Sequence, residues 1–151
     1  AYSLYKQDKN FIWYQKQIQK GHSNIIVTQL PNQKNIFDYN IQSLIKLRDS
    51  IGKSFLPGRN PESFMISEKE YLPFQKKVNY YGIKMLETRG TWEVKGDFMG
   101  GPFLNYLVED TLNDRVLFIE GFVFAPSKRK RDNIIELEAI IKSLKLKKEF
   151  N

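Results

Sequence analysis

The chain has 151 residues, 41% of them apolar and 14% aromatic, which predicts one domain with its own hydrophobic core. No run approaches the roughly 20 apolar residues of a membrane-spanning helix, so we expect no transmembrane segment, and residues 1–151 contain no signal-peptide pattern. The absence of cysteine excludes disulfides, cysteine-based zinc sites, thiol catalysis and iron–sulfur clusters.

The formal net charge of +7 is concentrated near the end of the chain. Residues 128–149 contain eight basic and four acidic side chains, and four of the basic ones are consecutive, Lys128–Arg131. Such a cluster is typical either of a solvated surface or of a patch that binds an anionic polymer or membrane. Because no aromatic residues are interleaved with these charges, we expect no specific nucleic-acid binding.

The first half of the chain predicts a hairpin followed by a helix. Two β-rich runs, residues 11–14 and 24–30, flank the polar segment 20–23. Beyond Pro31, Asn40 is a suitable N-cap, and apolar residues recur at helical spacing as far as Phe55, with Arg48 among the polar positions between them. Pro57-Gly58 then ends the helix.

The second half predicts a series of strands and a closing helix. The expected strands are 64–66, 78–86, 90–94, 103–109 and 115–124, the last two joined by a hairpin at residues 111–114. Asp132 is a suitable cap for a final helix, and Leu137 and Ile141 lie on its apolar face.

This order of elements favours the α+β class, with a mostly antiparallel sheet of five to seven strands and two helices packed on it. In the run 115–124 both sets of alternating residues are apolar. That strand is therefore expected in the middle of the sheet, covered on both faces.

Two segments carry a more specific resemblance. Arg89–Phe103 and Glu120–Pro126, followed by Lys130-Arg131, resemble an uncharacterised envelope lipoprotein family of Bacteroidetes-type bacteria, the domain of unknown function (DUF) family 4837. The similarity runs from about Tyr2 to Leu144 and corresponds to the C-terminal half of such a protein. It implies an exported lipoprotein whose lipidated N-terminal cysteine is not in this sequence, and it implies no reaction. More loosely, the element order looks like the PsbP-like α-β-α sandwich.

The segment from Gly96 to Pro102 has the most unusual composition. Its glycines, Gly96, Gly100 and Gly101, permit positive φ or close backbone approach, and Asp97 can close an Asx-type turn. A tight turn between strands needs no more than this. Alternatively, Phe98 and Met99 are presented at the tip to a partner, with Trp92 and Pro102 beside them.

A group of polar residues could lie close to this loop. If the flanking strands pair across it, Glu93 approaches Asn105, and the final hairpin brings Asn105 near Glu120. Two carboxylates on one face could hydrolyse a glycan. Pairing with Arg89 or Arg115 would instead make the group a structural salt bridge.

No cofactor or metal site is expected, because the chain has a single histidine, His22, in a polar segment that is typical of a hairpin turn. Trp13 and Trp92 are expected to pack in the core rather than to form a sugar platform.

The leading hypothesis is a non-enzymatic binding or assembly module of the bacterial envelope, either periplasmic or at the cell surface. Its partner would be an envelope protein or the upstream half of the same chain, and membrane contact would come only through the lipid anchor. The alternatives are a cell-wall glycan hydrolase and a protein that binds anionic polymers. The sequence leaves the oligomeric state open.

Overall fold

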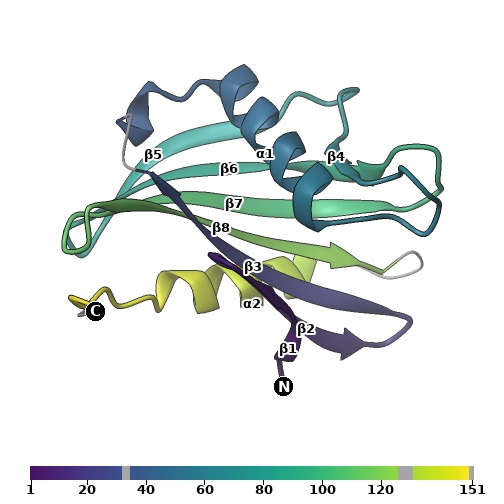
Figure 1. Ribbon diagram of the computed structural model, residues 1–151, viewed down its shortest axis with the longest axis horizontal. Coiled ribbons are helices and arrows are strands. Elements are labelled where there is room, and N and C mark those ends of the chain that lie inside the picture. Colours follow the sequence, from purple (N-terminus) through teal and green to yellow (C-terminus); the bar gives the residue numbers. More distant parts are fainter. Residues whose placement is uncertain (32–34, 126–130, 150–151) are drawn as a thin grey trace.

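A computed structural model describes residues 1–31, 35–125 and 131–149, which form one sheet flanked by helices (Figure 1). The elements in chain order are β1 (Ser3–Asp8), β2 (Phe11–Ile18), β3 (Gly21–Pro31), a short 3-10 helix η1 (Ile36–Asp38), α1 (Ile41–Phe55), β4 (Met65–Ser67), β5 (Phe74–Tyr80), β6 (Ile83–Val94), β7 (Gly100–Asp110), β8 (Arg115–Phe124) and α2 (Arg131–Lys142).

The sheet has eight strands in the order β1-β2-β3-β8-β7-β6-β4, and β5 pairs with the other part of β6. Every pairing is antiparallel. The two helices cover opposite faces, and β1 to β3 curl away from the plane of β6 to β8 (Figure 1). The predicted α+β class with two packed helices is confirmed. The sheet has one strand more than the five to seven expected, because β1 at its edge was not predicted.

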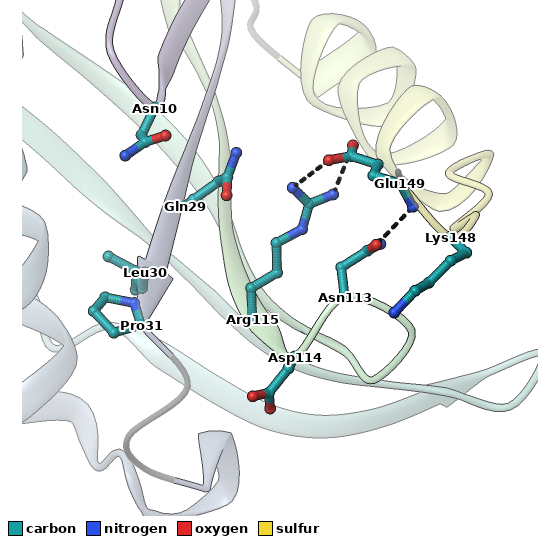
Figure 2. Close-up of a pocket in the computed structure, with 9 residues that line it drawn as sticks. All are labelled: Asn10, Gln29, Leu30, Pro31, Asn113, Asp114, Arg115, Lys148 and Glu149. Carbon is teal, nitrogen blue, oxygen red and sulfur yellow. Dashed lines mark hydrogen bonds and ion pairs between the residues drawn. The ribbon is translucent and has the colours of Figure 1, made fainter. Parts of the chain in front are cut away.

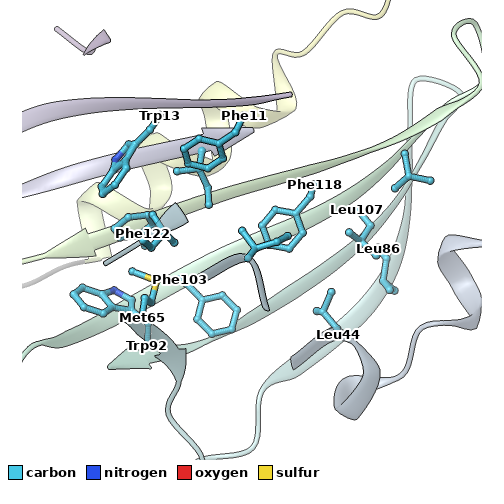
Figure 3. Packing of buried hydrophobic residues seen from close by; sticks show 14 of the residues in the cluster. Phe11, Trp13, Leu44, Met65, Leu86, Trp92, Phe103, Leu107, Phe118 and Phe122 are labelled. Atoms are coloured by element: carbon cyan, nitrogen blue, oxygen red, sulfur yellow. The ribbon is translucent and has the colours of Figure 1, made fainter. Parts of the chain in front are cut away.

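On the first face, α1 covers the larger apolar cluster (Figure 3). The predicted cap is present, because Asn40 and Ser43 form a reciprocal capping box at the start of the helix. Leu44 and Ile51 of α1 are buried against large side chains of the sheet, among them Phe103 and Phe118. The helix spacing read from the sequence therefore identifies the face that packs.

On the second face, α2 packs on the central strands. Leu137 and Ile141 are buried, as predicted. The helix crosses β8 where Gly121 has no side chain, since a Cβ there would lie 2.9 Å from Leu137 Cδ1. The burial of β8 on both faces confirms its expected central position.

Three expected boundaries were wrong. The run 78–86 is not one strand, because Tyr81 and Gly82 both have positive φ and form a tight two-residue turn between β5 and β6. The second part of that run, residues 83–86, instead joins the expected strand 90–94 in the single long strand β6. The last helix begins at Arg131, so Asp132 lies in its first turn rather than at its cap, where its charge still favours the helix dipole.

Across the described ranges, neither helix combines the length and apolar character needed to cross a membrane.

Candidate binding cleft

A cleft of about 380 Å³ opens on the α1 face of the sheet, beyond the C-terminal end of α1. Most of its lining is apolar and comes from strands on both sides and from the loop after α1: Tyr5, Trp13, Leu56, Pro57, Gly58, Met65, Trp92, Val94, Met99 and Phe122. The polar lining is Gln15, His22 and Arg59. This mixture of apolar walls and few polar groups is typical of binding sites.

Aromatic rings follow one another along the cleft (Figure 3). The centroid of Trp13 lies 4.5 Å from that of Tyr5 and 6.0 Å from that of Phe122. Phe122 in turn meets Trp92 edge to face at 5.7 Å. Trp13 and Trp92 are buried in the core cluster, as predicted, and each also presents part of its ring to the cleft.

Asn24 fixes one wall of the cleft by using every hydrogen-bonding position of its buried amide. Its Oδ1 accepts from Trp13 Nε1 and from Gln15 Nε2, both at 2.9 Å. Its Nδ2 donates to His22 Nδ1 at 2.8 Å and to the Phe122 carbonyl at 3.4 Å. Burial lowers the pKa of His22, so its ring is neutral at pH 7.

The loop between β6 and β7 forms the adjacent rim. Gly96 has φ of +80°, as its place in a turn requires, and Asp97 Oδ1 accepts from the Phe98 amide at 2.8 Å. The Arg59 guanidinium donates two hydrogen bonds, of 2.9 and 2.7 Å, to the Asp97 carboxylate. This contact holds the pKa of Asp97 below its ordinary value. Asp97 bonds a nearby backbone amide, but that of the next residue rather than the amide two residues on, so the predicted Asx-type turn is not formed. The Arg59 contact ties this loop to the one that follows α1.

The two apolar residues of this loop have different environments. Phe98 is fully exposed, whereas Met99 packs against the core and lines the cleft. Gly100, Gly101 and Pro102, which were expected in the loop, belong to β7. The exposed tip is therefore one side chain rather than two.

Gly101 is required by the close approach of neighbouring groups. A Cβ there would lie 2.0 Å from the Val123 carbonyl oxygen and 3.1 Å from Trp92 Nε1. The missing side chain lets the Trp92 indole donate to that carbonyl at 3.2 Å. Gly101 thus helps to position a wall of the cleft.

The structure does not bring the predicted carboxylate pair together. Glu93 pairs in register with Gly100, while Asn105 pairs with Thr88, so Glu93 does not approach Asn105. Gly100 and Asn105 are an odd number of positions apart on β7, and residues in register share a face, so Glu93 and Glu120 project from opposite faces. The expectation failed because it placed β6 in the wrong register.

Glu120 instead forms a buried ion pair with Arg48 of α1. The Glu120 carboxylate accepts from Arg48 Nε at 2.6 Å and Nη2 at 2.9 Å, and from Asn105 Nδ2 at 3.0 Å. The guanidinium also donates to Ser67 Oγ and stacks over the Phe103 ring. Arg48 was expected at a polar position, although its spacing of four residues from Leu44 already placed it on the buried face of the helix.

The two predicted arginines have other partners. Arg89 contacts Glu87 of its own strand at 3.3 Å and Glu138 of α2 at 2.6 Å. Arg115 pairs with Asp110 at 2.7 Å and with Glu149 at 3.0 Å. Both arginines form salt bridges, as expected, but their partners are not Glu93 or Glu120.

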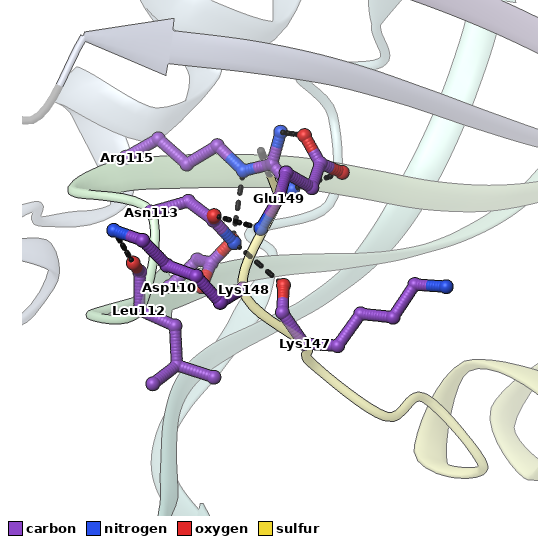
Figure 4. Close-up of polar contacts among 7 residues, drawn as sticks. All are labelled: Asp110, Leu112, Asn113, Arg115, Lys147, Lys148 and Glu149. Atoms are coloured by element: carbon purple, nitrogen blue, oxygen red, sulfur yellow. Dashed lines mark hydrogen bonds and ion pairs between the residues drawn. The ribbon is translucent and has the colours of Figure 1, made fainter. Parts of the chain in front are cut away.

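A larger, more polar pocket of about 490 Å³ lies at the opposite end of β8, around Arg115 (Figure 2). The chain after α2 lies across this pocket and binds Arg115 (Figure 4). Glu149 binds Arg115 through both carboxylate oxygens, and Lys148 Nζ donates to the Leu112 carbonyl at 2.9 Å. Because Arg115 and Lys148 already have partners within the chain, the aromatic cleft is the better candidate for an external partner.

Two other expectations concern charge and metal. Lys128, Arg129 and Lys130 lie outside the described residues, and Arg131 is exposed at the start of α2. Within residues 1–31, 35–125 and 131–149, no three acidic or histidine side chains are grouped so that they could hold a metal ion.

Comparison with solved structures supports the fold. The chain is similar to PA94 from Pseudomonas aeruginosa, described as a protein of unknown function and suggested to be a regulator, with a TM-score of 0.55 and 12% identity. The alignment covers 98% of this chain and 99% of that chain, and at this identity it shows the fold alone. A search of the curated proteins found no match.

A comparison of the sequence with models of protein families tests the family prediction directly. Residues 1–143 match the family model described as "Domain of unknown function (DUF4837)". The looser PsbP-like resemblance stays a prediction. The chain therefore belongs to the DUF4837 family.

Proposed function

We propose that the domain is a non-enzymatic binding module that holds an apolar side chain of a protein partner in the aromatic cleft. The observation that carries this proposal is the position of Met99, which lines the cleft while its chain neighbour Phe98 is fully exposed. A small molecule in the cleft would leave Phe98 in water, whereas a protein surface could cover both. Burial of each such side chain contributes roughly 1.5 to 3 kcal/mol.

The rigidity of the cleft supports this use. Trp13 and Trp92 have their indole N–H groups bonded to Asn24 and to the Val123 carbonyl, and the Arg59–Asp97 ion pair ties together two loops of the rim. A site held in place before binding loses less conformational entropy when a partner docks.

A pull-down in mild detergent, with the tagged domain as bait, tests the proposal. Tyr5→Ala and Phe98→Ala should each reduce recovery of the partner. Tyr71→Ala, which removes an exposed aromatic side chain outside the cleft, should not. The proposal fails if no partner protein is recovered, or if all three variants retain it equally.

The envelope location is a separate part of the proposal, supported by the family resemblance of the sequence. We propose that the full-length protein is an envelope lipoprotein. Fractionation of cells that express the full-length protein should recover it with the envelope, and recovery in the soluble cytoplasmic fraction would contradict this part alone.

A further inference from the structure

We infer that His22 is a proton switch on the aromatic cleft: protonation of its ring releases Trp13 from Asn24 and so changes the shape of the cleft. The inference concerns the regulation of the proposed site. It rests on the proposed function only for its effect on binding, because the change at Trp13 takes place in the free protein.

The argument begins with which groups can donate. An amide nitrogen can only donate, so the 2.8 Å contact from Asn24 Nδ2 makes His22 Nδ1 the acceptor. The neutral ring therefore carries its proton on Nε2. Gln15 Nε2, a second donor, lies 3.5 Å from the same ring nitrogen. A proton added at Nδ1 would face both of these donors.

Turning the Asn24 amide would remove the conflict at His22, but only by breaking the hydrogen bond from Trp13. With Oδ1 turned toward His22, its Nδ2 would face the N–H groups of Trp13 and Gln15, which now donate to Oδ1 at 2.9 Å. The turn would also break the 3.4 Å hydrogen bond from Asn24 Nδ2 to the Phe122 carbonyl. Since Asn24 is fully buried, no water replaces these bonds. The turn therefore leaves the Trp13 indole N–H without its acceptor, Asn24 Oδ1.

Among the residues that the structure describes, the neighbours of His22 named below offer no opposite charge to offset its protonation. Its neighbours are Gln17 in register on β2, Asn24 on β3 and Phe124 on β8, with the Phe124 ring centroid at 5.4 Å. Among the described residues that line the cleft the charged side chain is Arg59, which already pairs with Asp97. The Tyr5 hydroxyl is the remaining titratable group of the lining.

The two tryptophans allow an internal comparison by NMR. The Trp13 indole N–H donates to Asn24, whereas the Trp92 indole N–H donates to a backbone carbonyl that does not titrate. Between pH 8 and 5 the Trp13 signal should move with the same midpoint as the ring protons of His22, the single histidine of the chain, while the Trp92 signal stays in place. In His22→Gln the Trp13 signal should not move.

Three results would overturn the switch: an imidazole that stays neutral until the protein unfolds, indole signals that move together, or a Trp13 signal that still titrates in His22→Gln. The consequence for the cleft is measured separately with the uncharged aromatic dye N-phenyl-1-naphthylamine, which the added positive charge does not itself attract. Its affinity should fall below the His22 midpoint by up to about tenfold per pH unit. Absence of dye binding at pH 8 would count against the proposed cleft and leave the result at Trp13 intact, whereas dye binding without pH dependence would refute the coupling.

Discussion

Arg48 and Glu120 illustrate how a buried charge can serve the fold alone. Both side chains are almost completely buried, and each oxygen or nitrogen of the pair has a partner within α1, β4, β7 or β8. The pair lies beneath α1 and has no access to a substrate, which explains why this glutamate is structural.

Replacing one partner of this pair should be severe. Arg48→Met leaves the Glu120 charge buried without its partner and should reduce the free energy of unfolding by about 3 to 5 kcal/mol, measured by urea denaturation. The double variant with Glu120→Met should recover much of that loss. Lys16→Met, which breaks the partly exposed pair with Glu136, is the matched control and should have a much smaller effect. A comparable loss in both single variants would refute this account of the buried pair.

The loop tip gives a second prediction at the residue scale. Phe98→Ala should leave the melting temperature nearly unchanged, because the side chain is fully exposed. Met99→Ala should lower the free energy of unfolding by about 1 to 2 kcal/mol, because Met99 packs on the core. Thermal melts of the two single variants separate a binding role from a core role, and a large loss of stability in Phe98→Ala would assign Phe98 to the fold.

At the scale of elements, the contact between α2 and the sheet is the most sensitive to charge. Ile141→Asp places an unpaired carboxylate in the apolar cluster beneath the helix and should destabilise the domain by several kcal/mol, on the order of 3 or more. Ile135→Asp on the exposed side of the same helix is the control and should change little. Equal destabilisation by the two variants in chemical denaturation would mean that α2 packs through a different face.

Local patterns were sufficient to predict both helices and most strands. The capping signal at Asn40 and the alternation in β8 each fix a structure through contacts that are close in sequence. The cleft could not be predicted in this way, because it joins Tyr5, Trp92 and the loop after α1 through the order of strands in the sheet. The register of β6 against β7 is set by the loop between them, and placing Gly100, Gly101 and Pro102 in that loop rather than in β7 misplaced Glu93.

Across the whole molecule, His22 should make stability depend on pH in a defined window. Burial lowers its pKa in the folded state below the usual value of about 6.5, so the unfolded chain binds the proton more readily. The resulting stability is fully present above about pH 6.5 and is lost as the pH falls through the folded-state pKa. Urea denaturation at a series of pH values should show this loss in the parent protein.

The His22→Gln variant is the control for that window, because it removes the group that titrates. Partners also lower the pKa values of some acidic groups, such as Glu138 beside Lys142 and Arg89. The stability that these groups contribute is lost only at lower pH, below their unfolded pKa values of about 4. A curve that keeps the same slope near pH 6 in His22→Gln would show that another group is responsible.

The central claim is that a protein partner docks at the aromatic cleft and the exposed tip beside it. The most direct measurement is photo-crosslinking in cells that express the full-length protein, with benzoylphenylalanine in place of Phe98 or of Tyr71, both of which are exposed. The account predicts a discrete adduct with one envelope protein from position 98 and none from position 71. No adduct at position 98, or the same adduct from both positions, would contradict it.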